Sequence, residues 1–92
     1  KLDNLTMVTI TDKYLPHFAK LENEARNLTV PNGYENIKDS FIRSIESEAA
    51  SYDHFKKYLL TGNRTEDQFS IDNLSLAYGY EKIYEEFLFK NH

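Results

Sequence analysis

The chain is organised around residues 34–61, YENIKDSFIRSIESEAASYDHFKKYLLT, which have the pattern of one uninterrupted amphipathic helix. Apolar residues recur at steps of three and four, the spacing that places side chains on a single helical face. They are Tyr34, Ile37, Phe41, Ile45, Ala49, Tyr52, Phe55 and Leu59. Pro31-Asn32-Gly33 before this stretch predicts a turn, and Gly62 after it predicts a left-handed C-terminal cap.

Polar residues along the same stretch also follow helical spacing. Asp39 precedes Arg43 by four residues, and Asp53 precedes Lys57 by four, which favours ion pairs on the helix surface. Four serines recur at steps of three and four, and we expect them to line a small or polar boundary of the helix. They are Ser40, Ser44, Ser47 and Ser51. No Gly-x-Ser-x-Gly elbow accompanies them, so they carry no signature of a serine nucleophile.

The first 28 residues carry a second apolar track with the same spacing. Its members are Met7, Ile10, Tyr14, Phe18, Leu21, Ala25 and Leu28. Residues 7–11 are rich in β-branched side chains and suit a strand by propensity, and Pro16 interrupts a helix interior. We expect one long helix from about residue 3 that kinks near Pro16, since the apolar track keeps its phase on both sides. The alternative is a helix that begins between residues 11 and 15.

The last third of the chain predicts a third helix, over about residues 66–90. Thr65 and Gln68 have the spacing of an N-terminal capping box. The apolar stripe is Phe69, Asn73, Leu76, Tyr80, Ile83 and Phe87, widened by Leu74, Ala77, Tyr84 and Leu88. Gly79 lies within the helix, where we expect it to let a neighbouring helix or a tyrosine approach closely. Short connections between three long helices predict an all-α, antiparallel, up-down-up three-helix bundle over residues 1–92 as a single domain.

Composition and charge argue against several classes of partner. The net charge is −4 and the basic residues are scattered among acids, whereas nucleic-acid binding needs a clustered basic face. No apolar run approaches the roughly 20 residues that span a bilayer, so we expect no direct membrane insertion by this segment. Cysteine is absent from the sequence, which removes disulfides, thiolate metal sites and cysteine nucleophiles.

Histidines and carboxylates give no catalytic pattern. His17, His54 and His92 lack the Glu-x-x-His and His-x-x-x-His spacings of metal sites on helices. The acids cluster along the helices, and we expect them to form a solvated charged face; they include Glu46, Glu48, Glu81, Glu85 and Glu86. The sequence therefore predicts no metal, no cofactor and no catalytic residue, and we expect the protein not to be an enzyme.

Aromatic residues supply the one candidate interaction surface. Seven tyrosines and six phenylalanines make up 14% of the chain, and most of them fall on the apolar stripes. Tyr58, Tyr78 and Phe89 lie off those stripes. Because exposed tyrosines are enriched at binding surfaces, we expect Tyr58 and Tyr78 to mark a contact surface.

The chain resembles small helical extracellular domains of Gram-positive bacterial lipoproteins and secreted proteins. The resemblance begins near residue 14 and is carried by Leu28-x-Val30-Pro31 before a long helix, Leu59-Leu60-Thr61-Gly62-Asn63 after it, and Gly79 within the last helix. It implies a domain that follows a signal peptide and a lipid-modified cysteine, outside the cell or at its surface. It implies no catalytic or binding residues.

Three functional interpretations follow. The first is a non-catalytic module, exported or surface-anchored, that binds an unknown protein partner or associates with itself. The second is an intracellular adaptor or regulatory protein in the cytoplasm. The third is a bundle that holds a lipid or another apolar molecule among its aromatic side chains.

Overall fold

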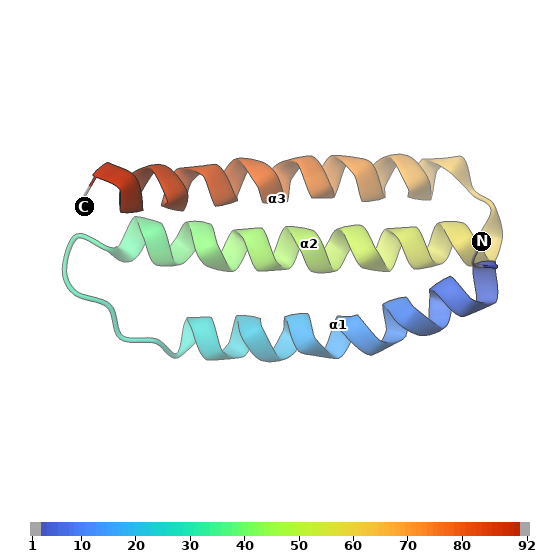
Figure 1. The fold of residues 1–92 in the computed structure, drawn as a ribbon, viewed down its shortest axis with the longest axis horizontal. Helices are drawn as coiled ribbons and strands as arrows, with labels where there is room; N and C mark the ends of the chain where they lie inside the picture. The colour runs from blue at the N-terminus through green and yellow to red at the C-terminus, as the bar shows by residue number, and fades with distance from the viewer. Residues whose placement is uncertain (1–2, 91–92) are drawn as a thin grey trace.

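The chain folds into three long α-helices in the computed structural model, which describes residues 3–90. They are α1 (Asn4–Arg26), α2 (Glu35–Thr61) and α3 (Arg64–Lys90), and each runs antiparallel to the one before it (Figure 1). The described residues contain no strand. The prediction of an all-α, up-down-up three-helix bundle is confirmed. The molecule measures 46 × 22 × 22 Å, and its long dimension is set by the helices, since 27 residues span about 40 Å.

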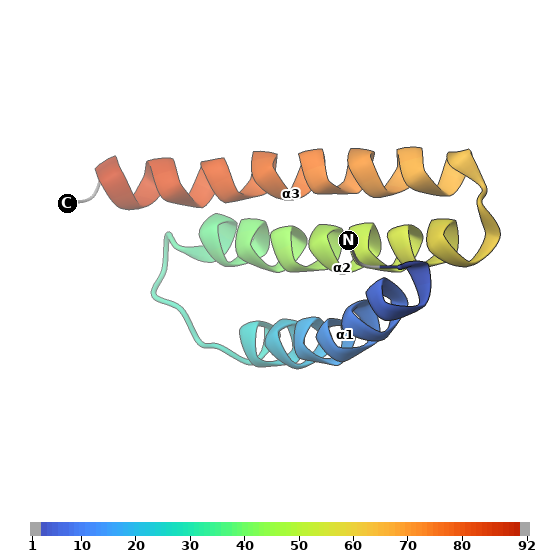
Figure 2. The same cartoon turned by 45° about the vertical axis from the view of Figure 1, so that its right-hand side comes forward.

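Helix α1 is continuous through Pro16, as expected, and residues 7–11 are helical rather than extended. Its ribbon bends along its course in both views (Figure 1 and Figure 2). Asp3 caps its first turn by accepting a 2.7 Å hydrogen bond from the main-chain N–H of Thr6, a contact that lowers the pKa of Asp3. At the other end, the Lys38 ammonium donates to the carbonyls of Arg26 and Leu28 at 2.9 and 2.6 Å. The helix thus has partners for its terminal polar groups at both ends.

The connection between α2 and α3 is tight. Gly62 adopts a left-handed conformation with φ of 71°, and its N–H donates to the Tyr58 carbonyl at 2.7 Å, as predicted for a cap. Asn63 follows directly, and its side-chain oxygen accepts the N–H of Thr65 at 3.0 Å. The predicted cap at Thr65 is therefore wrong. Asn63 caps α3 instead, because the left-handed turn at Gly62 brings its side chain to the first unpaired N–H groups of the new helix.

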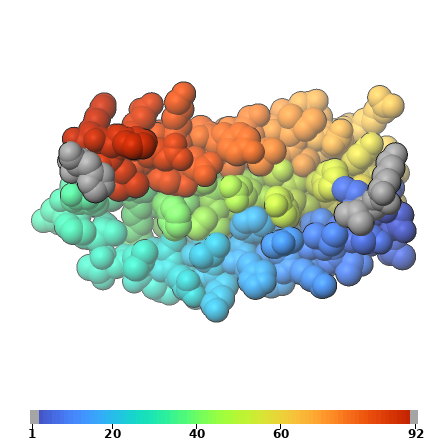
Figure 3. All heavy atoms as spheres, viewed as in Figure 1, coloured from blue at the N-terminus to red at the C-terminus, as the bar shows by residue number. Residues whose placement is uncertain are grey.

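Helix α2 lies between the other two (Figure 1 and Figure 2). Among the described residues, no Cα of α1 lies within 8 Å of a Cα of α3. In the space-filling view, the side chains of α2 form a band between those of α3 and α1 (Figure 3). Helix α2 therefore has a partner on each side, and two further faces that neither neighbour covers fully. The two shorter dimensions of the molecule are equal at 22 Å, so the three helices do not lie in one flat layer.

Small side chains occupy the contact between α2 and α3. The four serines of α2 are buried, as are Ser70 and Ala77 of α3. Ser51 contacts Ser70 of α3, and Ser44 contacts Tyr84 of α3. The sequence predicts these serines at a boundary of the helix; the structure buries all four, and Ser44 and Ser51 lie in the contact with α3. Small side chains reduce the distance between two helix axes. The larger apolar side chains consequently lie at the edges of the contact, and among the described residues no large side chain is less than 2% exposed.

Aromatic pairs lie along those edges and join the helices. Phe18 of α1 contacts Tyr52 of α2 edge-to-face, with ring centroids 5.0 Å apart. Phe41 of α2 contacts Tyr84 of α3 in the same way at 5.7 Å. Edge-to-face packing of this kind adds about 0.5–1.5 kcal/mol to the burial of each pair. These rings join the three helices and still present part of their surface to solvent.

Candidate functional site

One open face of α2 is charged. Its residues recur at helical spacing, and ion pairs join them: Arg43 to Asp39 at 2.8 Å, and Lys57 to Asp53 at 3.1 Å. Both pairs were predicted from the sequence. Arg26 of α1 forms an ion pair with Glu46 of α2 at 3.3 Å. This face has the composition of an ordinary solvated surface.

Two hollows lie along α2, and each takes residues from α1, α2 and α3. We call the two hollows and the stretch between them the α1–α3 groove. The first hollow has a volume of about 590 Å³ and takes residues from all three helices, lined by Met7, Ile10, Thr11, Ser51, Tyr52, Phe55, Asp67, Ser70, Ile71, Leu74 and Tyr78. Several of these apolar side chains are largely exposed, including Ile71 at 51% and Tyr78 at 60%.

The second hollow lies at the other end of the α1–α3 groove, next to the connection between α1 and α2. Its volume is about 310 Å³, and its lining is Ala25, Leu28, Val30, Pro31, Tyr34, Ile37, Lys38, Phe41, Tyr84 and Leu88. Lys38 is its one charged lining residue, and the ammonium of that side chain already binds the carbonyls that end α1. The second hollow therefore presents an almost wholly apolar surface.

Two carboxylates lie between the hollows. Glu48 of α2 follows the second hollow and precedes the first along its helix, and Glu81 of α3 lies between Tyr78 of the first hollow and Tyr84 of the second. Both are half-buried. Burial raises the pKa of Glu48, and the negative charge of Glu81 raises it further. Burial also raises the pKa of the Tyr84 hydroxyl, with Glu81 as the next cause. We call Glu48 and Glu81 the acidic pair.

The acidic pair corrects one expectation from the sequence. Glu46, Glu85 and Glu86 are exposed, as expected of a solvated face, whereas Glu48 and Glu81 are half-buried and the charge of Glu81 raises the pKa of Glu48. The ion pairs among the described residues include neither of them. The half-buried position of Glu48 could have been predicted from the sequence, because Glu48 interrupts the apolar face of residues 34–59.

The two tyrosines singled out from the sequence lie in different places. Tyr78 is exposed and lines the first hollow. Tyr58 is half-buried, with its ring 6.4 Å from that of Phe55. Since Ser51 lies opposite Ser70, the antiparallel register places Tyr78 about 15 residues from Tyr58 along α2, or roughly 22 Å. The structure does not bring them into one patch.

Gly79 was expected to allow a close approach within the chain. A methyl group added at this position would meet nothing within 4 Å, so that expectation is wrong for the contacts within this chain. Gly79 belongs instead to a shallow depression of about 660 Å³ on α3, lined by Asp72, Ser75, Leu76, Gly79, Tyr80 and Ile83. All its lining residues belong to one helix, so this depression is a surface feature rather than a groove between helices.

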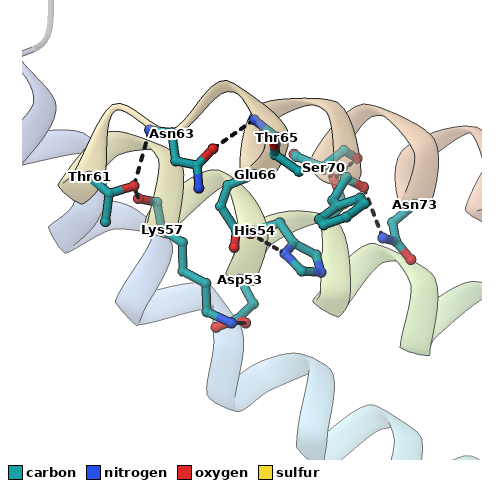
Figure 4. A network of polar contacts seen from close by, with 11 residues as sticks. Asp53, His54, Lys57, Thr61, Asn63, Thr65, Glu66, Ser70 and Asn73 are labelled. Atoms are coloured by element: carbon teal, nitrogen blue, oxygen red, sulfur yellow. Dashed lines mark hydrogen bonds and ion pairs between the residues drawn. The ribbon is translucent and has the colours of Figure 1, made fainter.

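The histidines are separate from the α1–α3 groove. Nδ1 of His54 lies 2.5 Å from Oε2 of Glu66, a contact that joins α2 to the first turn of α3 (Figure 4). The His54 ring lies 5.3 Å from the ring of Phe69. His17 is exposed beside Tyr14. The prediction for His92 lies outside the described residues. Within residues 3–90, no three His, Asp or Glu side chains are arranged to hold a metal ion.

Two further findings concern the helices and the similarity of the chain to known proteins. None of the helices within residues 3–90 combines the length and the hydropathy needed to cross a membrane. Searches against protein-family models, curated proteins and solved structures found no match to this chain.

Proposed function

We propose that the protein is a non-catalytic helical module that binds a helix of a partner protein in the α1–α3 groove. The observation that carries this proposal is the distribution of side-chain size. The smallest side chains fill the contact between α2 and α3, while Ile71, Tyr78 and other large apolar side chains line an open groove. Contiguous apolar surface bordered by polar residues is typical of an interaction site.

The shape of the groove favours a helix as the bound segment. Its floor is the apolar face of α2, and α1 and α3 form its walls, as in grooves that receive amphipathic helices. Along α3 the hollows extend from Asp67 to Leu88, roughly 32 Å at 1.5 Å per residue. A helix of about 20 residues matches that length. Its apolar side chains would enter the two hollows at spacings of three, four and seven residues.

The polar groups of the first hollow support binding rather than catalysis. The Thr11 hydroxyl donates to the Met7 carbonyl at 2.9 Å, and the Ser51 hydroxyl donates to the Ser70 carbonyl at 2.8 Å. Hydroxyls engaged with main-chain carbonyls are not activated nucleophiles, since activation needs an adjacent base. The remaining lining is chiefly apolar and suits a protein surface.

The proposal is tested by selecting helical peptides of 20 residues from a display library on the immobilised protein. We expect recovered peptides whose binding is lost in Ile71→Glu, because the substitution places a charge in the first hollow. Leu60→Glu is the matched control, since Leu60 is 61% exposed and lines neither hollow. Circular dichroism checks that both variants remain helical. Failure to recover any peptide, or equal loss of binding in both variants, contradicts the proposal.

We propose the outside of a bacterial cell, or its surface, as the place where the module acts. The support is the resemblance of residues 28–31, residues 59–63 and Gly79 to extracellular domains of Gram-positive lipoproteins. The measurement is the intact mass and N-terminus of the native protein in separated membrane and aqueous fractions. A lipid-modified cysteine ahead of this sequence supports the surface location. An initiator methionine on a protein confined to the cytoplasm contradicts it.

A further inference from the structure

The floor of the α1–α3 groove indicates the chemistry of its partner. We propose that the groove binds an amphipathic helix of another protein that carries a lysine or arginine at its centre, opposite Glu48 and Glu81. This inference rests on the proposed function, and it adds the partner's charge pattern to it.

The order of side chains along the groove is apolar, acidic, apolar. On α3, Leu74 and Tyr78 precede Glu81, and Tyr84 and Leu88 follow it. Helix α2 repeats this order in the opposite direction, with the second hollow before Glu48 and the first hollow after it. A partner helix that fills both hollows must therefore cross the acidic pair midway along its length. Its central turns cross the part of the groove that carries the two carboxylates, whereas its ends meet apolar side chains.

Covering the acidic pair with an apolar side chain is unfavourable. Glu48 and Glu81 already repel each other in a half-buried position, and no ion pair among the described residues relieves that repulsion. An apolar residue above them would remove their remaining water and supply no counter-charge. An ammonium or guanidinium group that faces Glu48 or Glu81 supplies both a counter-charge and hydrogen-bond donors. The site thus discriminates among partner helices by the charge of the residue at their centre.

Charge also weighs against a second copy of this chain as the occupant. A two-fold dimer that joins groove to groove, with the hollows of one copy facing those of the other, places its axis at the acidic pair. Four carboxylates would then meet in the interface. The same repulsion opposes a fatty acid whose carboxylate approaches the centre of the groove. The acidic Asp67 in the first hollow adds to the negative charge, and the Lys38 ammonium in the second is held by main-chain carbonyls.

The experiment uses the same peptide library, with its central three positions fully randomised, and compares selection on three proteins. These are the unmodified chain, the double variant Glu48→Gln/Glu81→Gln, and the control Glu24→Gln/Glu86→Gln, which removes the same charge from exposed positions. We expect lysine and arginine to dominate the central positions for the unmodified chain and the control, and to lose that preference for the double variant. In titrations with a recovered peptide, changing its central lysine to glutamine weakens binding about 10-fold to the unmodified chain only.

The possible outcomes separate the two proposals. Peptides that depend on Ile71 but show no central basic residue overturn this inference and leave the proposed function intact. An absence of binding peptides overturns both. Analytical ultracentrifugation of the protein alone completes the test, with a monomer expected. A dimer that Ile71→Glu dissociates identifies a second copy as the occupant, and a lipid in native mass spectra that Ile71→Glu displaces identifies an apolar ligand; each overturns the inference.

Discussion

The hydroxyl of Ser51 on α2 donates a 2.8 Å hydrogen bond to the main-chain carbonyl of Ser70 on α3, and the two hydroxyl oxygens lie 3.2 Å apart. Both residues are buried. A serine can reach a main-chain carbonyl of a neighbouring helix only where no large side chain separates the two backbones. The contact therefore marks the close approach of α2 and α3, and this approach leaves the larger apolar side chains to line the α1–α3 groove.

Enlarging Ser51 should separate the helices. We expect Ser51→Leu to lower the free energy of unfolding by about 1–3 kcal/mol, because extra methylene groups in a filled contact force displacements of side chains and backbone. Ser75→Leu is the control, since Ser75 is exposed on α3. Urea denaturation followed by circular dichroism measures both. Equal stability of the two variants would show that the contact between α2 and α3 is looser than described.

Two glycines should respond to alanine with opposite signs. Gly62 has φ of 71°, where a Cβ is unfavourable, so Gly62→Ala is expected to destabilise the fold by about 1 kcal/mol. Gly79 lies inside α3 with open space at its Cβ position, so Gly79→Ala is expected to stabilise the fold by about 1 kcal/mol through helix propensity. Thermal unfolding of the two variants measures the sign of each change in stability. A loss of stability in Gly79→Ala would reveal a close neighbour at that position.

Glu48 should make stability depend on pH. Its pKa is raised in the folded state, chiefly by burial and also by Glu81. The stability that protonated Glu48 gives the fold is therefore complete below its ordinary pKa, and it is lost as pH rises through the raised value. Glu48→Gln stays neutral, so it does not lose stability in this way. We expect the melting temperature to rise by about 2 °C at pH 7, and no difference from the unmodified chain near about pH 3.5, where Glu48 is already neutral.

The control for this prediction is Glu24→Gln. It removes the same charge from an exposed position of α1 and should change the melting temperature less at neutral pH. A gain in Glu48→Gln that persists at acidic pH would assign the effect to packing or helix propensity instead of charge. Melting curves recorded from pH 3 to pH 8 separate these explanations.

His54 should hold the turn between α2 and α3. We expect His54→Ala to lower the free energy of unfolding by about 1 kcal/mol, since it removes the 2.5 Å contact with Glu66 and the ring contact with Phe69. His17→Ala, at an exposed position of α1, should have little effect. Amide hydrogen exchange locates the change, with protection decreasing around residues 54–70. Uniform loss of protection along all three helices would contradict a local role.

Much of the fold is determined by local sequence patterns. The apolar spacing in residues 34–61 predicts α2 to within one residue, because helical periodicity depends only on which residues recur at three and four. Gly62 ends that helix, since its left-handed conformation is favourable for glycine and unfavourable for most other residues. The sequence predicts that α3 begins at about Glu66, two residues after Arg64, where the helix begins in the structure. Thr65 and Asn63 are both suitable caps, and only the conformation of the turn decides which side chain reaches the free N–H groups.

The tertiary structure alone decided the candidate site. The sequence shows that α2 has an apolar face and a row of serines, but not which of them meets α3. The folded chain buries the serines and leaves the large apolar residues at the groove, since close packing of two backbones requires small side chains between them. The pairing of Glu48 with Glu81 depends on the register of two helices that are distant in sequence, and local patterns carry no information on that register. The sequence by itself thus determined the three helices and the bounds of α2, because these depend on local spacing and on Gly62. The tertiary structure decided which side chain caps α3, which faces are buried and which remain open.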